Sequence, residues 1–453
     1  MESLDEALRD LAELGPRATE RFSAAIDQAW IQEALTSTGS ASVRRRKIPA
    51  DAVVWMVLGM ALFRDRSIDE VVDHLGLVLP DKDGVKGCVR SAIVQSRYRV
   101  GPAALSQLFR TTADAWHAKV KRDGYRGLSL HAVDGTCMRV QDSDANFRHF
   151  GKPGGRGGSN DAGYPQLRLA CLLSLDDRLI RDVSFGPFAT SEKELAERLW
   201  PQLPAKSLTI VDRGFNDYET WASLADRGDE RHLLVRLKAN VKPDIVELLP
   251  DGSALVCVRP STNAKAKDSK VRPEIRARIV AYQNPDGEPC RLLTTLVDHE
   301  TYPAKELVEL YHQRWEIEIA FDELKTHMLE RLECIRSLKA EGVEQELWGI
   351  LLMYNLVRFE MAQAAVVFDV DPNRMSFRHS LILLRIFWET TAWSSSPSKI
   401  PMRLAELRDR FQLLVLPPRR SERRYPRHVK IKMSNYDRNR GKRPLAATTE
   451  LVK

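Results

Sequence analysis

The chain has 453 residues, of which 69 are Lys or Arg and 62 are Asp or Glu, giving a net charge of +7. At about 150 residues per domain this length predicts two to four domains. Apolar residues make up 43% and charged residues 29% of the chain, values typical of a soluble globular protein. The composition excludes a chain disordered throughout, a collagen-like fibre and a small disulfide scaffold.

Two features argue against export or a membrane span. The most apolar stretch, Ala52–Phe63, is well short of the roughly 20 residues that cross a bilayer. Residues Met1–Arg17 are acidic and lack the apolar segment of a signal peptide. The six cysteines form no CxxC pair, so we interpret them as reduced thiols that pack in the protein interior. We expect a cytoplasmic protein without membrane contact.

The N-terminal part, to about residue 120, has helical patterns. Ala50–Phe63 is apolar nearly all round, and Ser67 with Glu70 occupies capping-box positions at the start of another helix. From about Leu128 short apolar runs predict strands. The expected strands are Leu128–Val140, Gln166–Leu175, Leu179–Phe185, Leu208–Val211 and Leu233–Leu237, with helices at Ser191–Leu203 and Asp217–Arg227. This order predicts a mixed α/β sheet.

After Lys238 the alternation of helix and strand stops. Residues 239–300 contain three further strand-like runs, Ala254–Val258, Ile275–Tyr282 and Leu292–Val297, which we interpret as a β-rich insertion. Helices are predicted from Pro303 to about Met328, then at Val343–Phe368 and Ser376–Trp393. We therefore expect three domains: 1–120, which is helical; 121–340, a mixed α/β domain that contains the β-rich insertion; and 341–453, helices followed by a basic tail.

The positive charge is concentrated in that tail. Eleven basic and two acidic residues lie between Arg419 and Arg443, so this segment alone carries more positive charge than the whole chain. Basic residues interleaved with Tyr425 and Tyr436 would suit an arm that tracks phosphates and stacks on bases, although a solvated tail without specific function is an equally fair interpretation. If the tail binds nucleic acid, Arg423, Arg424, Lys430 and Lys432 are the residues expected to contact it.

Two aspartates end apolar strands in matching contexts. Asp134 precedes Gly-Thr and Asp212 precedes Arg-Gly-Phe. Each could simply cap a turn, but ligands of α/β sheets gather at the carboxyl ends of strands. The pair is therefore a candidate site.

The long predicted helix carries a third candidate carboxylate. Tyr311, Arg314, Glu318 and Lys325 fall within about 60° of one another around a helix. The alternative is a solvated face with ion pairs. The same geometry predicts that Glu316 and Glu323 point to the opposite, solvent-facing side.

Two aspartates and a glutamate would form an all-oxygen site. Such a site suits Mg²⁺, and a pair of ions about 4 Å apart can support phosphoryl transfer. Arg314 and Lys325 would neutralise phosphates, so the site and the tail both indicate a nucleic-acid backbone as substrate.

These motifs resemble a known family. Asp134-Gly-Thr, Asp212-Arg-Gly-Phe and the spacing Y-x2-R-x3-E-x6-K, met by Tyr311, Arg314, Glu318 and Lys325, are similar to DDE transposases of the insertion-sequence-four group. The resemblance extends to Arg44–Pro49, Ala61–Ser67 and Val429–Ser434, and so covers most of the chain.

The resemblance implies an RNase H-like core with Asp134, Asp212 and Glu318 as ligands of two Mg²⁺ ions, or of Mn²⁺. It implies cut-and-paste transposition of double-stranded DNA through a hairpin intermediate, by a homodimer that bridges the two terminal inverted repeats and inserts them into target DNA. Tyr311, Arg314 and Lys325 would contact DNA near the cleavage point. Such a protein would be associated with the nucleoid when bound.

One departure from the family concerns base flipping. Better-known relatives hold a flipped base with a Trp in the insertion, whereas Tyr282 is the only aromatic residue between 239 and 300.

Two other functions share these features. A metal-dependent nuclease on the same core would need the three carboxylates but not the tyrosine and lysine beside the glutamate. A DNA-binding transposase derivative without catalysis would be marked by loss of a carboxylate or of an end domain, and neither is seen.

Overall fold

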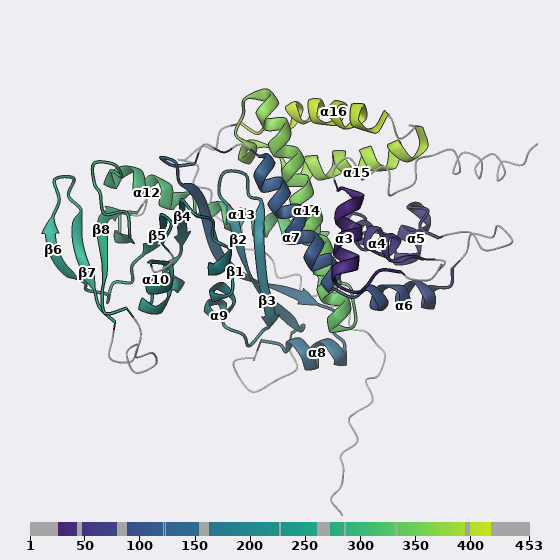
Figure 1. Cartoon of the computed structure of the whole chain (residues 1–453), viewed down its shortest axis with the longest axis horizontal. Helices are drawn as coiled ribbons and strands as arrows, with labels where there is room; N and C mark the ends of the chain where they lie inside the picture. Colours follow the sequence, from purple (N-terminus) through teal and green to yellow (C-terminus); the bar gives the residue numbers. More distant parts are fainter. Residues whose placement is uncertain are drawn as a thin grey trace, which may run out of the picture. The chain divides into compact units, whose positions relative to one another are not determined.

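The structure is a computed structural model (Figure 1). It describes residues 26–42, 48–78 and 88–417, with gaps at 121, 123, 154–162, 226–227, 261–271, 285–286, 331–333 and 395–398. The basic tail and the Arg44–Lys47 run lie outside these described residues.

Helices form the N-terminal part, as predicted. They are α3 (Gln28–Ser37), α4 (Ala50–Leu62), α5 (Ile68–His74), α6 (Arg90–Val100) and α7 (Ala103–Lys119). The capping box at the start of α5 is confirmed, because Ser67 accepts the Glu70 N–H at 3.3 Å and Glu70 accepts the Ser67 N–H at 2.6 Å. Both contacts satisfy backbone donors that a helix start leaves unpaired.

The long helix α14 (Ala340–Phe368) packs against α4 and α7. The approach to α4 is close enough to require glycine, because a Cβ at Gly349 would lie 2.8 Å from Val57 Cγ1 and 3.1 Å from the Val57 carbonyl oxygen. A helix from the C-terminal part therefore shares a core with the N-terminal helices.

A mixed sheet lies at the centre of the fold, and its first five strands confirm the predicted ones. They are β1 (Ser129–Val140), β2 (Gln166–Ser174), β3 (Ile180–Pro187), β4 (Ser207–Val211) and β5 (Arg231–Arg236). Their order is β3-β2-β1-β4-β5. β1, β4 and β5 run parallel, and β2 is antiparallel to β1 and β3.

Each face of this sheet is covered. Ala132, Ile210 and Leu234 join the core that contains α4, α7 and α14. The next residues along the strands, Val133 and Val235 among them, join a second core with α9 (Glu192–Glu197) and α10 (Tyr218–Ala225). Burial of both faces explains why these strands read as continuous apolar runs in the sequence.

The β-rich insertion extends the same sheet. Its strands are β6 (Asp244–Leu248), β7 (Ala254–Val258), β8 (Ile275–Gln283) and β9 (Pro289–Thr294), and β9 pairs antiparallel with β5. Figure 1 shows β6, β7 and β8 at the far end from β3. Strand β6 was not predicted, because all five of its residues are exposed and no alternation of burial marks it.

The predicted helix from Pro303 to Met328 is divided into three parts. They are α12 (Ala304–His312), α13 (Trp315–Asp322) and a π-helical segment, η3 (Glu323–Met328). Between α12 and α13 the backbone hydrogen bonds close over three residues, from Gln313 N to Leu310 O at 2.9 Å and from Arg314 N to Tyr311 O at 3.2 Å. The helix is therefore wound more tightly than an α-helix before Glu318 and more loosely after it.

The remaining elements are short strand β10 (Cys334–Ile335), which pairs parallel with the end of β1, and helices α15 (Phe377–Ser394) and α16 (Ile400–Phe411). Of the helices in the described part of the chain, α14 is long and apolar enough to cross a membrane, but 83% of its most apolar window is buried inside the protein. That burial is typical of a core helix.

Candidate active site

The strand register brings Asp134 and Asp212 together. Ala132 on β1 pairs with Ile210 on β4 in parallel register, so the positions two residues further on are neighbours on the same sheet face. Asp212 also caps a turn, since its Oδ1 accepts the Gly214 N–H at 2.6 Å. The turn-capping role of Asp212 is therefore confirmed, and it is compatible with a place beside Asp134.

Helix α13 brings Glu318 to the same side through Arg314. The Arg314 Nη2 donates to Glu318 Oε1 at 2.7 Å, and its Nη1 lies 3.6 Å from Asp134 Oδ2. The guanidinium thus lies between the strand carboxylate and the helix carboxylate, and these ion pairs raise the pKa of Arg314 even though burial opposes the shift.

Lys325 and Tyr311, the other two residues of the Tyr-Arg-Glu-Lys spacing, lie on the same side of the sheet as Asp134 or beside Asp212. Lys325, in the π-helical segment, donates a hydrogen bond to the hydroxyl of Thr136 on β1. Thr136 lies two residues after Asp134 and so shares its face. Tyr311 is buried and lines a cleft of about 390 Å³ together with Asp212 and Arg314. Burial raises the pKa of Tyr311, so its phenol stays neutral and can donate a hydrogen bond.

A fourth carboxylate at the site, Glu192, was not predicted from the sequence. It is the first residue of α9, and its Oε1 accepts the Gly135 N–H at 2.8 Å. A Cβ at Gly135 would lie 2.5 Å from the Glu192 Cγ, so glycine is needed for the two to approach. The only available signal was that Asp134 is followed by Gly and that α9 begins soon after β3.

Burial and two neighbouring carboxylates change the acidity of Asp134. Burial raises its pKa to about 7; the Gly135 N–H opposes this shift, while Glu192 and Asp212 add to it. A carboxyl in this setting is costly to ionise without a compensating cation. A bound cation would supply that compensation.

The side chains fit a divalent ion by donor type. Asp134, Asp212 and Glu318 offer only carboxylate oxygens, which hard cations prefer. Among the described residues no group of three or more acidic, His or Cys side chains is gathered closely enough to hold a metal ion. The Arg314 guanidinium occupies the position between two of the three instead.

Basic side chains surround the cleft beside Asp212. Arg213 and Arg236 line it, and an adjoining cleft of about 770 Å³ shares both and adds Lys238, Arg291 and Tyr282. The insertion strands β8 and β9 provide one wall, which explains why no local motif predicted the clefts. An anionic chain could lie here against positive charge.

Two predicted placements differ from the structure. Glu323 was expected to face solvent and is buried, 6% exposed, while Glu316 is half-buried. Both face arginines, because Arg178 from the β2–β3 turn pairs with each of them. The predicted tail contacts Arg423, Arg424, Lys430 and Lys432 lie outside the described residues.

This architecture defines a class of enzyme. A five-stranded sheet in the order β3-β2-β1-β4-β5, with carboxylates on β1, after β4 and on a following helix, is an RNase H-like catalytic core. Enzymes with this core act on the backbones of nucleic acids.

The chain belongs to the insertion element 4 family of DDE transposases. Residues 16–110 match the family model described as insertion element 4 transposase N-terminal, and residues 125–356 match the transposase DDE domain. It is thus a DNA-binding transposase, and DDE domains act with divalent metal ions.

Two transposases of Escherichia coli agree with this family. The chain is 34% identical to the transposase InsG for insertion sequence element IS4 of Escherichia coli (strain K12), over 91% of this chain and 92% of the relative. It is 32% identical to the putative transposase InsZ of the same organism, over 51% of this chain and 76% of the relative. A solved structure of the piggyBac transposase synaptic complex with hairpin DNA is similar with a TM-score of 0.46 and 12% identity, covering 89% of this chain and 86% of that chain.

Proposed function

We propose that this transposase moves an insertion element by cut-and-paste transposition, with Asp134, Asp212 and Glu318 as the ligands of two Mg²⁺ ions, which Mn²⁺ could replace. The observation that carries the proposal is the parallel register of β1 and β4, which brings both aspartates to one sheet face beneath α13. When bound, two such ions activate the attacking oxygen and stabilise the leaving oxygen of an in-line displacement.

The neighbouring side chains would handle the DNA backbone. Arg314 would leave its two carboxylates and bind phosphate when ions take its place, because a guanidinium pairs with either anion in the same forked geometry. Lys325, held at Thr136, would add a second positive charge. The neutral phenol of Tyr311 would donate a hydrogen bond to the strand in the cleft.

The reaction would pass through hydrolysis at an element end, attack by the freed 3′-hydroxyl to form a hairpin, hairpin opening and strand transfer. Tyr282, which lines the cationic cleft, is the insertion aromatic available for stacking on a base.

Other parts of the chain would bind the remaining DNA. Residues 1–120 would form the domain that binds an element end, 121–340 the catalytic domain, and 341–453 the helices and basic tail that add non-specific affinity. A homodimer would bridge two terminal inverted repeats, in the cytoplasm and on the nucleoid.

The test is cleavage of a labelled duplex that carries an element end and its flank. With Mg²⁺ we expect nicking followed by a hairpin product. Asp134→Asn and Glu318→Gln, which keep shape but remove a charge, should each lower cleavage by about a thousandfold or more and leave DNA binding within a few fold.

Three outcomes would contradict the proposal in different ways. Normal cleavage by Glu318→Gln would refute the ligand assignment. Cutting at any sequence without hairpins would favour a nuclease. Binding without cleavage by the wild-type chain would favour a non-catalytic derivative.

A further inference from the structure

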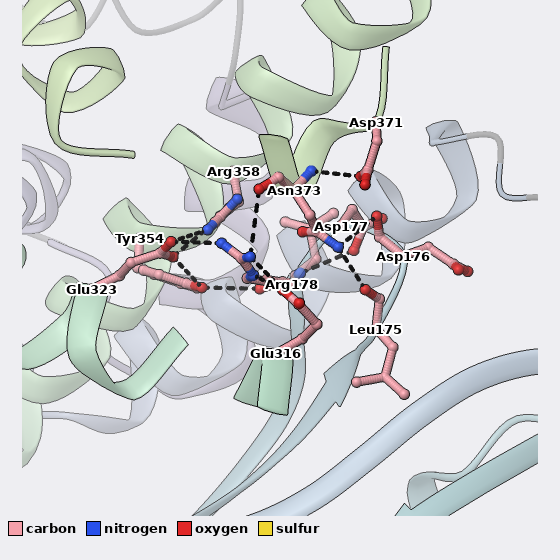
Figure 2. Close-up of polar contacts among 11 residues, drawn as sticks. Leu175, Asp176, Asp177, Arg178, Glu316, Glu323, Tyr354, Arg358, Asp371 and Asn373 are labelled. Carbon is pink, nitrogen blue, oxygen red and sulfur yellow. Dashed lines mark hydrogen bonds and ion pairs between the residues drawn. The ribbon is translucent and has the colours of Figure 1, made fainter. Parts of the chain in front are cut away.

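Arg178 connects the β2–β3 turn to the helix that carries Glu318. Its Nε donates to Glu316 Oε2 at 2.6 Å, and its Nη1 donates to Glu323 Oε1 at 2.8 Å. Figure 2 shows the guanidinium between the two carboxylates. Arg178 is 2% exposed, so both contacts are shielded from water.

Helix α14 completes the network from the other side. Arg358 Nε donates to Glu323 Oε2 at 3.0 Å, and the Tyr354 hydroxyl lies 3.2 Å from the same oxygen. Two arginines thus balance two glutamates. A buried carboxylate with this many donors is fully compensated, which explains why Glu323 can lie in the core.

The two glutamates bracket the proposed ligand. Glu316 and Glu323 are seven residues apart, about two helical turns, and Glu318 lies between them. A planar guanidinium that binds both restrains sliding and rotation of the helix. Glu323 is also the first residue of the π-helical segment. Its ion pair with Arg178 therefore fixes the point at which the helix widens, two residues before Lys325.

The backbone of Arg178 adopts a conformation that is less common for a residue other than glycine. Its φ is +57°, in the left-handed region where glycine or asparagine is favoured. An arginine in this strained conformation persists when its surroundings over-determine it. The Arg178 N–H donates to the Ser174 carbonyl at 3.0 Å and its carbonyl accepts from the Tyr354 hydroxyl at 3.1 Å, so backbone and side-chain contacts together hold this conformation.

We infer that Arg178 is a positioning residue that holds α13 and η3 so that Glu318 and Lys325 face the strand aspartates. The inference rests on the proposed role of Glu318 as a metal ligand. Arg178 itself contacts neither the aspartates nor the cleft beside Asp212 among the described contacts.

The test compares Arg178→Met with a matched control, Arg408→Met, in the full-length chain. Arg408 Nε pairs with buried Glu360 at 2.6 Å, which joins α16 to α14 without contacting the catalytic helix. Both substitutions leave a buried glutamate short of a partner, so both should lower the melting temperature. Arg178→Lys is the third variant, because it keeps the charge but cannot bridge two carboxylates as a fork does.

Three quantities are measured at a temperature where all variants are folded: the single-turnover cleavage rate, the DNA affinity, and Mn²⁺ binding by electron paramagnetic resonance. We expect Arg178→Met to lower the rate by about a hundredfold and Mn²⁺ affinity by about tenfold, with DNA affinity unchanged. Arg178→Lys should show smaller losses in the same direction, and Arg408→Met should stay within about twofold of wild type.

The outcomes separate this inference from the proposed function. If Glu318→Gln abolishes cleavage while both Arg178 variants cleave and bind Mn²⁺ as Arg408→Met does, positioning by Arg178 is refuted and the ligand assignment stands. If Glu318→Gln cleaves normally, the ligand assignment itself fails. In the double variant Arg178→Met with Glu318→Gln, Mn²⁺ affinity should fall no further than in Glu318→Gln alone. Both changes act through the Glu318 carboxylate, which one displaces and the other removes.

Discussion

Glu192 affects the site although no motif singles it out. It lies against Gly135 and beside Asp134, and with Asp212 it adds to the rise that burial causes in the pKa of Asp134. Its contribution depends on α9 folding back onto β1. Carboxylates around a metal site tune affinity even when they do not bind the metal directly.

Replacing Glu192 by Gln removes one negative charge from the site. We expect the Mg²⁺ concentration for half-maximal cleavage to rise by about tenfold, with DNA affinity unchanged. The control is Glu194→Gln on the same helix, because Glu194 is exposed and pairs with Arg198 at 2.6 Å. An unchanged Mg²⁺ requirement in Glu192→Gln would exclude Glu192 from the electrostatics of the site.

Residue spacing predicted some of these contacts and not others. The strand-end aspartates and the Tyr-Arg-Glu-Lys spacing could be identified because each lies in one continuous pattern. Glu192, Arg178 and the clefts could not, since they come together only through the chain's topology. The burial of Glu323 was mispredicted. Helical periodicity places it opposite Glu318, but does not show that Arg178 and Arg358 lie on that side and pair with it.

At the scale of elements, a second ion network joins α14 to the N-terminal helices. Glu346 of α14 pairs with Arg64, which follows α4, and with Arg336, which follows β10. Burial alone would raise the pKa of Glu346, but Arg64, Arg336 and Arg97 outweigh it and lower the pKa to about 2. Its folded pKa therefore lies below the unfolded value.

This shift makes the network's contribution to stability depend on pH. The contribution is complete above about pH 4.5 and is lost as the pH falls toward 2, since the unfolded state then binds the proton first. We expect Glu346→Gln to lower the free energy of unfolding by on the order of 3 kcal/mol at pH 7. Urea unfolding at pH 7, 5 and 3 should show the difference from wild type shrinking at pH 3, and a difference independent of pH would contradict the assigned shift.

At the scale of the whole molecule, the sequence predicted the kinds of element better than their arrangement. Apolar runs and capping residues located strands β1 to β5 and β7 to β9 and the helices α4, α5, α9, α10 and α12 to α15. They did not single out α3, α6, α7, α8 (Asp144–Phe150), α16, β6 or β10. Nothing local indicated that α14 would share a core with α4 and α7, or that the insertion would join the central sheet. Both arrangements depend on pairings between residues far apart in the chain.

The pairing of β9 with β5 means that the insertion protects the core from aggregation. Without it, β5 would become an edge strand whose free N–H and C=O groups, flanked by apolar side chains such as Leu234, could recruit strands from other molecules. A chain in which a short linker replaces residues 239–300 should therefore be recovered in the insoluble fraction. Recovery as a folded monomer, judged by light scattering, would show that the edge is blocked in another way. Any reduction of this enzyme to a minimal catalytic unit would have to retain β9.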